Sequence, residues 1–307
     1  MNKLLKIFYL LSIFFLFACK QEKNVPTKQI NTAKKEVVVT SKKSFNAYWY
    51  SGKAELNSYA LKQSRYGEIR EGEVVLVFVT EPFSLNKQVK LDNAKEAGTD
   101  FVSIMKLNTI RKFTTGIYEY SLMSSVFTPI DIQKYPHTLK MNTSVQEWCG
   151  HTFTQLNLKD NKYQFQEFSY FEVEGDTEKT IPVALLEDEL MTRIRLQEGI
   201  LPLGEIDLIC SSTYSRLSHQ ELKVTKATIR KTATDSIITY TIDYLNFNRT
   251  VSMDVQKEFP YKILSWSEDN GEGLITEATL KKSIKEPYWN LKRNADETKR
   301  KELQLIN

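Results

Sequence analysis

Three residues near the middle of the chain have types and a spacing that could support thiol or metal chemistry. Glu147, Cys149 and His151 occupy alternate positions of the stretch 145–158, which reads as a β-strand. Alternate residues of a strand point to the same face of a sheet, so the carboxylate, thiol and imidazole would share one face. A returning strand over 163–174 would add Tyr170 and Glu172 to it. We expect these five side chains to form a candidate ligand-binding surface.

The register of this hairpin follows from its predicted turn. Asp160 and Asn161 form a candidate two-residue loop, and pairing outward from it places Cys149 opposite Glu172 and His151 opposite Tyr170. The other face would be apolar, with Trp148 opposite Val173, Gly150 opposite Phe171, Leu156 opposite Phe165, and Leu158 opposite Tyr163. A shift by one residue would mix the two sets, so the clean sorting supports this register. Phe171 would then be free to lie over Gly150.

Three interpretations of this cluster stay open: an ordinary, partly exposed sheet face, a non-catalytic binding groove, or a thiol-dependent enzyme. A nucleophilic cysteine needs a nearby base or cation, and His151 lies about 6.6 Å along the strand from Cys149. That separation is too long for a direct hydrogen bond unless the side chains lean together. A Glu/Cys/His metal site is geometrically conceivable, but an exported thiol is a poor metal ligand. We expect no metal and no cofactor, and the pattern favours a binding protein over an enzyme.

Other chemical signals in the chain are weaker. Arg216 and His219 lie in an expected loop or strand edge, where structural roles are common. The aromatic residues 48–50 indicate core packing at the start of the folded body. The sequence contains no G-x-S-x-G elbow, no Walker loop, and no G-x-G-x-x-G after a strand.

The amino terminus has the layout of a bacterial lipoprotein signal. Lys3 and Lys6 precede an apolar run from Ile7 to Ala18, and Leu16-Phe17-Ala18 leads into Cys19. As a helix the apolar run would span roughly 18 Å, which is short against a hydrocarbon core of about 30 Å. We expect cleavage before Cys19, lipidation of that cysteine, and attachment to the membrane through the lipid. Lys20 is not the aspartate associated with inner-membrane retention, which favours the periplasmic face of the outer membrane.

Composition narrows the range of partners. The formal charge of the 307-residue chain is +4, and removal of the two lysines in residues 1–18 leaves +2. Such a balanced charge predicts no nucleic-acid binding. Candidate ligands for an envelope protein are a lipid, a glycan or another protein. Beyond Cys19 only Cys149 and Cys210 remain. An exported compartment would permit their pairing, but two cysteines do not define a disulfide framework.

The pattern of elements predicts a mainly β fold. We expect strands at 74–79, 101–112, 117–127, 145–158, 163–174, 205–210, 222–231, 236–244, 250–257, 262–268 and 274–284. Leu186, Leu190 and Ile194 form one helical stripe that Gly199 would end. These elements predict long antiparallel curved sheets, or an open half-barrel, with one amphipathic helix at the junction. The resulting division is a signal peptide (1–18), a flexible tether (19–43), an N-terminal β subdomain (44–182), the helix (183–199), a C-terminal β subdomain (200–293) and a charged tail (294–307).

Three short stretches carry a family resemblance. Residues 49–55 (WYSGKAE), 65–70 (RYGEIR) and 144–151 (SVQEWCGH) are similar to those of a family of uncharacterised Gram-negative lipoproteins of the Bacteroidota type. The likeness extends from about residue 45 to the C-terminus. Members often carry the label "septum formation inhibitor Maf". This chain lacks the Ser-x-Ser-Pro-Arg-Arg motif of the true Maf nucleotide pyrophosphatases and their alternating helices and strands, so the resemblance does not imply that activity. The long antiparallel pattern also resembles periplasmic open barrels that hold lipids or lipoproteins, a likeness of architecture only.

Overall fold

Strands make up most of the chain between residues 54 and 286, and they belong to a single sheet. The computed structural model describes residues 37–305, and the chain from Lys42 onward forms one compact unit. The expected signal peptide, Cys19 and most of the expected tether lie outside the described residues. The region expected to be tether up to residue 43 overlaps helix α1 (Val37–Trp49). The core packing expected of residues 48–50 holds for Trp49, which is only 2% exposed, and for Tyr48, which packs against the core, but not for Tyr50, which is 50% exposed.

The first half of the sheet is a meander of long antiparallel strands. Its strands are β1 (Ala54–Arg65), β2 (Glu68–Ser84), β3 (Phe101–Thr115), β4 (Tyr118–Pro129), β5 (Lys140–Glu147), β6 (Gly150–Lys159), β7 (Lys162–Ser169) and β8 (Thr177–Pro182). The second half contains β9 (Leu185–Leu186), β10 (Gly204–Ile209), β11 (Val224–Ala233), β12 (Ile237–Tyr244), β13 (Thr250–Gln256), β14 (Ile263–Asp269) and β15 (Ile275–Glu286). Three further helices are α2 (Leu190–Leu196), α3 (Ser212–Leu217) and α4 (Thr298–Glu302).

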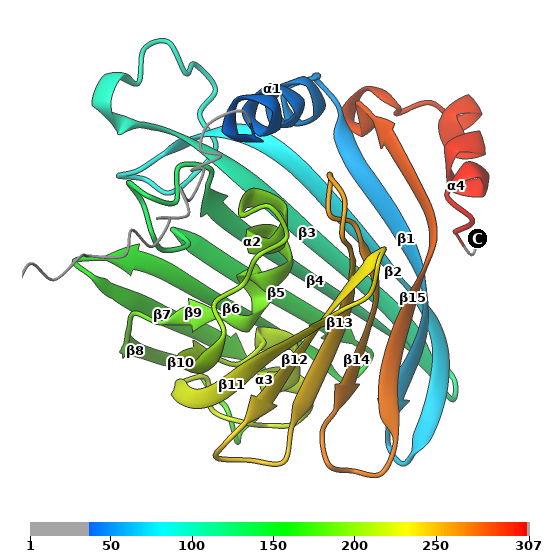
Figure 1. Cartoon of the computed structure of the whole chain (residues 1–307). Helices are drawn as coiled ribbons and strands as arrows, with labels where there is room; N and C mark the ends of the chain where they lie inside the picture. Colours follow the sequence, from blue (N-terminus) through cyan, green and yellow to red (C-terminus); the bar gives the residue numbers. More distant parts are fainter. Residues whose placement is uncertain (1–36, 306–307) are drawn as a thin grey trace, which may run out of the picture. The chain divides into compact units, whose positions relative to one another are not determined.

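Pairing between β1 and β15 joins the two halves into one 15-stranded sheet. The strand order is β8-β7-β6-β5-β4-β3-β2-β1-β15-β14-β13-β12-β11-β10-β9, so β8 and β9 are its two edges and the sheet is not closed into a barrel (Figure 1). All pairs are antiparallel except the short pair β9–β10. The expected mainly β fold is therefore confirmed. One continuous sheet, an alternative that the sequence left open, runs through both regions expected as β subdomains.

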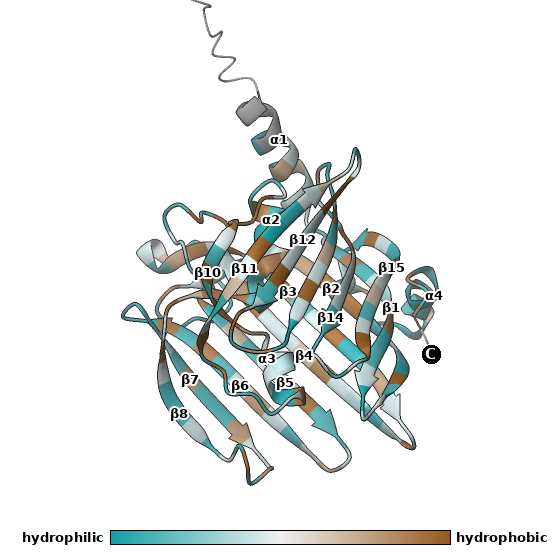
Figure 2. Ribbon diagram, turned by 60° about the horizontal axis from the view of Figure 1, so that its bottom comes forward, coloured by the Kyte–Doolittle hydropathy of each residue, from teal (hydrophilic) through white to brown (hydrophobic). Residues whose placement is uncertain are grey.

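Alternating side chains give this sheet an apolar inner face. In β12, for example, Ile238, Tyr240 and Ile242 are buried while the residues between them are partly exposed. Apolar and polar bands alternate along the strands in Figure 2. Helices α2 and α3 lie in the concavity of the sheet (Figure 1), and Leu190 and Ile194 of α2 belong to its main apolar core. The inner face is thus packed against the chain's own helices.

Most expected strands are present within a few residues of their predicted bounds. The expected helix over 183–199 is shorter, because Leu185 and Leu186 pair with β10 and the helical turns of α2 begin only at Leu190. The stretch 145–158 is not one strand, since a turn at residues 148–149 divides it into β5 and β6. Strands β1 and β8 and helix α3 were not expected.

Candidate functional site

The sequence-predicted cluster lies at the turn between β5 and β6. Glu147 pairs with Gly150, so Trp148 and Cys149 form the tip of a hairpin and do not continue a strand. The Glu147 carboxylate accepts the backbone N–H of Cys149 at 2.7 Å, which stabilises the turn. The expected pairs Cys149–Glu172 and Trp148–Val173 are consequently wrong.

The part of the expected register closer to residues 160–161 is correct. Leu158 lies opposite Tyr163 and Leu156 opposite Phe165 in the β6–β7 pair. Strand β7 ends at Ser169, however, and Tyr170, not Phe171, lies over Gly150. A Cβ at Gly150 would be 2.6 Å from the Tyr170 ring, so glycine is needed for this contact.

The five predicted site residues are brought near one end of the hairpin but do not enclose a ligand. Cys149, His151, Tyr170 and Glu172 are exposed, and Glu147 is partly exposed. Hydrogen bonding to Glu147 and its negative charge raise the pKa of the Cys149 thiol. A raised pKa leaves less thiolate at neutral pH, the opposite of what a nucleophilic cysteine requires. The thiol-enzyme interpretation therefore lacks support from this geometry.

The second cysteine is also unsuited to chemistry. Cys210 is buried, and burial raises its pKa to about 12. Both cysteines are free thiols in the structure.

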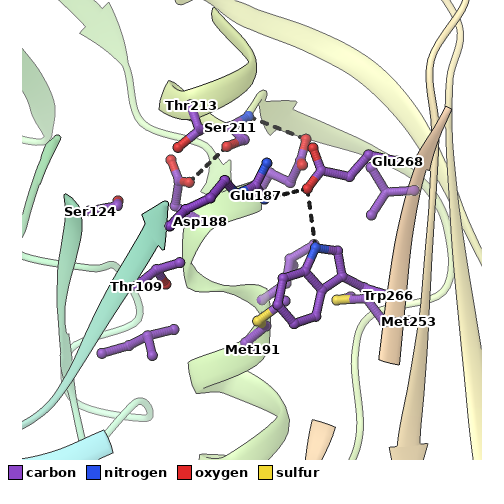
Figure 3. Close-up of a pocket in the computed structure, with 14 residues that line it drawn as sticks. Thr109, Ser124, Glu187, Asp188, Met191, Ser211, Thr213, Met253, Trp266 and Glu268 are labelled. Atoms are coloured by element: carbon purple, nitrogen blue, oxygen red, sulfur yellow. Dashed lines mark hydrogen bonds and ion pairs between the residues drawn. The ribbon is translucent and has the colours of Figure 1, made fainter. Parts of the chain in front are cut away.

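A small polar cavity lies inside the sheet, between α2 and the strands that face it (Figure 3). Its volume is about 70 Å³, and its polar lining includes Thr109, Arg111, Ser124, Glu187, Asp188, Ser211, Thr213, Trp266 and Glu268. Arg249 donates from Nη2 to Glu187 Oε1 over 2.5 Å, and Arg111 donates from Nη2 to Glu268 Oε1 over 2.5 Å. These buried carboxylates are thus satisfied by guanidinium groups, as buried charges must be.

The electrostatics of the cavity divide its carboxylates into two kinds. Burial would raise the pKa of Glu268, but Arg111 and Arg249 outweigh it and hold that pKa at about 2. Asp188 has no such cation. Burial raises its pKa to about 6 despite the hydrogen bonds from the Ser212 N–H and the Ser211 hydroxyl. Asp188 therefore changes charge near neutral pH.

The size of this cavity limits what it can hold. A volume of 70 Å³ accommodates a few water molecules, whereas pockets for organic ligands measure about 300–1,000 Å³. Helices α2 and α3 fill the concavity of the sheet. The inner face therefore does not support the binding of a lipid, which was one of the ligands expected from the sequence.

A larger cleft lies where the β7–β8 edge meets the chain after α3. Its volume is about 270 Å³, and its lining includes Glu167, Glu174, Lys179, Arg216 and His219. Glu174 Oε1 is 3.3 Å from Arg216 Nη1 and 2.6 Å from His219 Nδ1. Arg216 and His219 were expected to have structural roles, and the structure places both in a cleft with three glutamates. The sequence contained no signal for this cleft, because residues 165–179 and 215–222 meet only through the curvature of the sheet.

One part of the outer face of strands β4–β7, on the side of the sheet away from α2 and α3, is unusual, and the same face carries Glu119, Lys140, Lys159 and Lys162 around that part. We call that part the neutral face. It consists of Ser121, Met123, Ser125, Asn142, Ser144, Gln146, His151, Phe153, Gln155, Gln166 and Phe168. None of these side chains carries a permanent charge, in a chain of which 26% is Asp, Glu, Lys or Arg. Trp148 lies at the tip of the β5–β6 hairpin beside this face, whereas the Tyr170 ring lies against Gly150 on the opposite face of β6.

Comparisons with known proteins add nothing to this geometry. No protein-family description, no curated protein and no solved structure matches the chain. Within residues 37–305, no helix is both long enough and apolar enough to cross a membrane. The same part of the chain holds no group of three or more His, Cys, Asp or Glu side chains placed to bind a metal ion.

Proposed function

We propose that this chain is a lipid-anchored protein of the bacterial cell envelope whose folded body is a non-catalytic binding module for another protein. The anchor is the lipid on Cys19, which lies outside the described residues. The outer membrane, with the body on its periplasmic side, is the location that the signal sequence favours. The binding surface is the neutral face with the adjoining Trp148. It includes His151 and borders Glu147, Cys149 and Glu172 of the sequence-predicted cluster.

The observation that carries this proposal is a group of exposed apolar side chains on an uncharged surface. Trp148 is 70% exposed and Phe168 47%, and Met123 and Phe153 are also exposed. Exposed apolar patches of this kind mark interaction sites. Aromatic residues and Met are enriched at the centres of protein interfaces and charged residues are depleted there, which is the composition of the neutral face.

Strand register makes these side chains one continuous surface. Met123 lies opposite Ser144, Ser144 opposite Phe153, and Phe153 opposite Phe168. Cross-strand neighbours on one face are about 4.5–5.5 Å apart, so Met123, Phe153 and Phe168 lie in one row across four strands, with Ser144 between Met123 and Phe153. A flat row of this kind suits a partner surface better than a small enclosed ligand.

On the neighbouring strands β1 and β2, the chain covers the outer face of the sheet. There Leu56, Val77 and Val79 are buried in an apolar cluster with Leu303 of the C-terminal segment, which packs over them. The Ser58 hydroxyl donates to the Leu303 carbonyl oxygen and fixes this cover. The chain thus covers its own apolar surface beside β1 and β2 and leaves that of β4–β7 exposed.

The proposal is tested by site-specific crosslinking in intact cells. A photoreactive benzoylphenylalanine at Phe153 should give a discrete adduct with one protein, and the adduct should disappear when Trp148→Ala and Phe168→Ala are added. The matched control is the same probe at Ile275, an exposed apolar position of β15 that is 44% exposed. The purified partner should bind the wild-type body at least tenfold more tightly than the Trp148→Ala, Phe168→Ala variant. Equal adducts at both positions, or adducts with glycan only, would contradict a protein-binding role.

A further inference from the structure

The end of the sheet at which the chain enters the folded body is strongly basic. Strand β1 begins there at Ala54, which lies opposite Glu286 at the end of β15, so residues 42–53 and 285–293 are neighbours (Figure 1). Lys285 joins the two segments, because its Nζ donates to the Tyr48 carbonyl oxygen and, at 3.1 Å, to the Ser51 hydroxyl. The two segments contain a single acid, Glu286, and six cations, which are Lys42, Lys43, Lys53, Lys285, Lys292 and Arg293.

The charge of these cations is not neutralised nearby. The Glu286 carboxylate is paired with Lys299 of α4, whose Nζ is 2.7 Å from Oε1. Apart from Lys285, the six cations are exposed and form no ion pair within residues 37–305. The loop 85–100 and the tail 294–302 each carry three cations and three acids, so they add no compensating charge. A net positive surface therefore remains, which we call the basic end.

The other end of the same two strands has the opposite charge. Residues 65–71 and 269–277, around the end of β1 and the start of β15, carry two cations and five acids. One of these cations, Arg70, is paired with Glu68 at 2.7 Å. The two charges are separated by the length of β1, which is about 40 Å for 12 residues. An anionic surface would orient such a molecule with its basic end first.

Two exposed aromatic side chains flank the basic end. Tyr50 is 50% exposed and Trp289 is 40% exposed. The Tyr50 hydroxyl is 3.0 Å from Ser103 Oγ of β3, whereas Trp289 follows β15. Because β2 and β1 lie between β3 and β15, the two rings lie on either side of the start of β1. Tyr and Trp are enriched at the head-group level of membranes, and Lys and Arg are attracted to anionic lipids.

The position of the expected anchor indicates which surface the basic end meets. The segment between the lipid on Cys19 and Lys42 joins the body at this end of the sheet, through α1. The lipid therefore connects the basic end, and not the acidic end, to the membrane. Phospholipid phosphates supply the complementary charge. Even a weak contact is effective in this arrangement, because the covalent link makes the contact intramolecular.

We infer that the basic end docks on anionic phospholipid head groups of the membrane that holds the Cys19 lipid. Tyr50 and Trp289 lie among the head groups, and the acidic end points away from the membrane. The inference rests on the lipid anchor of the proposed function and adds an orientation to it. The body stands on the ends of its strands, which leaves the neutral face accessible to a partner because that face is a side of the sheet.

Co-sedimentation of the unlipidated body, Lys20–Asn307, with vesicles tests the docking. The body should bind vesicles of equal parts phosphatidylglycerol and phosphatidylethanolamine at low salt. Phosphatidylcholine vesicles should bind it at least tenfold more weakly, and salt should weaken the binding because it screens exposed charges. Absence of binding to the anionic vesicles, or equal binding to phosphatidylcholine, would overturn the inference. Neither result would touch the Cys19 anchor or the neutral face, because this probe carries no lipid and no partner is present.

Two triple variants with the same change of charge locate the contact. The test variant combines Lys53→Gln, Lys292→Gln and Arg293→Gln, and it should bind anionic vesicles at least tenfold more weakly than wild type. The matched control combines Lys223→Gln, Lys226→Gln and Arg230→Gln, exposed positions on and beside β11, and it should bind like wild type. Unchanged thermal unfolding shows that both variants are folded. Equal losses in the two variants would mean attraction by net charge alone and would refute docking through the basic end.

Tryptophan quenching by phosphatidylglycerol brominated near its head group tests the orientation. Trp49 and Trp266 are buried, and Trp289 lies at the basic end. Strand β5 runs in the same direction as β1, so Trp148 after β5 lies at the other end of the sheet. The brominated lipid should quench Trp148→Phe, which retains Trp289, and should leave Trp289→Phe unquenched. Quenching that persists in Trp289→Phe would refute this orientation.

Discussion

Replacing Asp188 by asparagine should stabilise the protein at pH 7.5 much more than at pH 5. The pKa of Asp188 rises from 3.8 to about 6 on folding. Because the folded-state pKa is raised, ionised Asp188 opposes folding, fully above pH 6 and not at all below about pH 3.8. One pKa unit corresponds to about 1.36 kcal/mol. The cost is therefore about 3 kcal/mol at pH 7.5 and roughly half of that at pH 5.

Asparagine removes this cost at both pH values but has one carboxyl acceptor fewer. Asp188 accepts from the Ser211 hydroxyl at 3.0 Å and from the Ser212 N–H at 2.9 Å, and loss of one such bond costs about 1 kcal/mol. Asp188→Asn should then be about 2 kcal/mol more stable than wild type at pH 7.5 and less than about 1 kcal/mol more stable at pH 5.

Urea unfolding at the two pH values, followed by tryptophan fluorescence and extrapolated to water, measures the difference. The control is Asp207→Asn, because Asp207 is an exposed residue of β10 whose contact with Lys226 is a surface ion pair worth at most about 1 kcal/mol. If the stability gain of Asp188→Asn were the same at pH 7.5 and pH 5, the reasoning about the buried carboxylate would be refuted.

Three further changes have defined outcomes. Cys19→Ser should abolish lipid attachment and leave the protein unprocessed or soluble; processed protein that stays with membranes through high-salt and carbonate washes would exclude the lipid as anchor. Cys149 should react with iodoacetamide only at higher pH than an ordinary thiol, and Glu147→Gln should move that reaction to lower pH, because Glu147 raises the thiol pKa; pH profiles that coincide would exclude this coupling. Gly72→Ala should destabilise the protein by about 1–3 kcal/mol in urea unfolding, because a Cβ would lie 2.2 Å from the Lys112 carbonyl oxygen; an unchanged unfolding midpoint would show that the β2–β3 pair relaxes freely.

The strands were predictable from the sequence because alternation is a local property. The stretch 236–244 alternates apolar and polar residues, and β12 covers Ile237–Tyr244 with the same alternation of burial. The helical stripe was only partly correct. Leu186 matches the period of Leu190 and Ile194, but it pairs instead with Ile209. That parallel pairing depends on a distant segment, which a local pattern cannot reveal.

The candidate sites were less predictable than the fold. The two central residues of the turn, Trp148 and Cys149, are not among Gly, Pro, Asn and Asp, the residues by which turns are recognised, and Gly150 at its last position is the one exception in the turn. Its stabilising contact comes from the longer side chain of Glu147. The cleft around Glu174 and Arg216 depends on two segments whose approach is set by the curvature of the whole sheet. Neither feature leaves a periodic or compositional signal in the sequence.

The charged contacts of the segment before and within α2 explain why binding should occur on the outside of this sheet. Glu187 is held by Arg249, Arg193 pairs with Glu189, and Arg195 forms a fully buried ion pair with Glu55 of β1. Apolar contacts alone could have filled the concavity without fixing the orientation of this segment, whereas ion pairs are directional. Removing one partner of a buried ion pair costs about 3–5 kcal/mol. Moving this segment to open the inner face would break the pairs with Arg249 and Glu55 together. A partner therefore meets a surface that needs no such opening, and the neutral face is one.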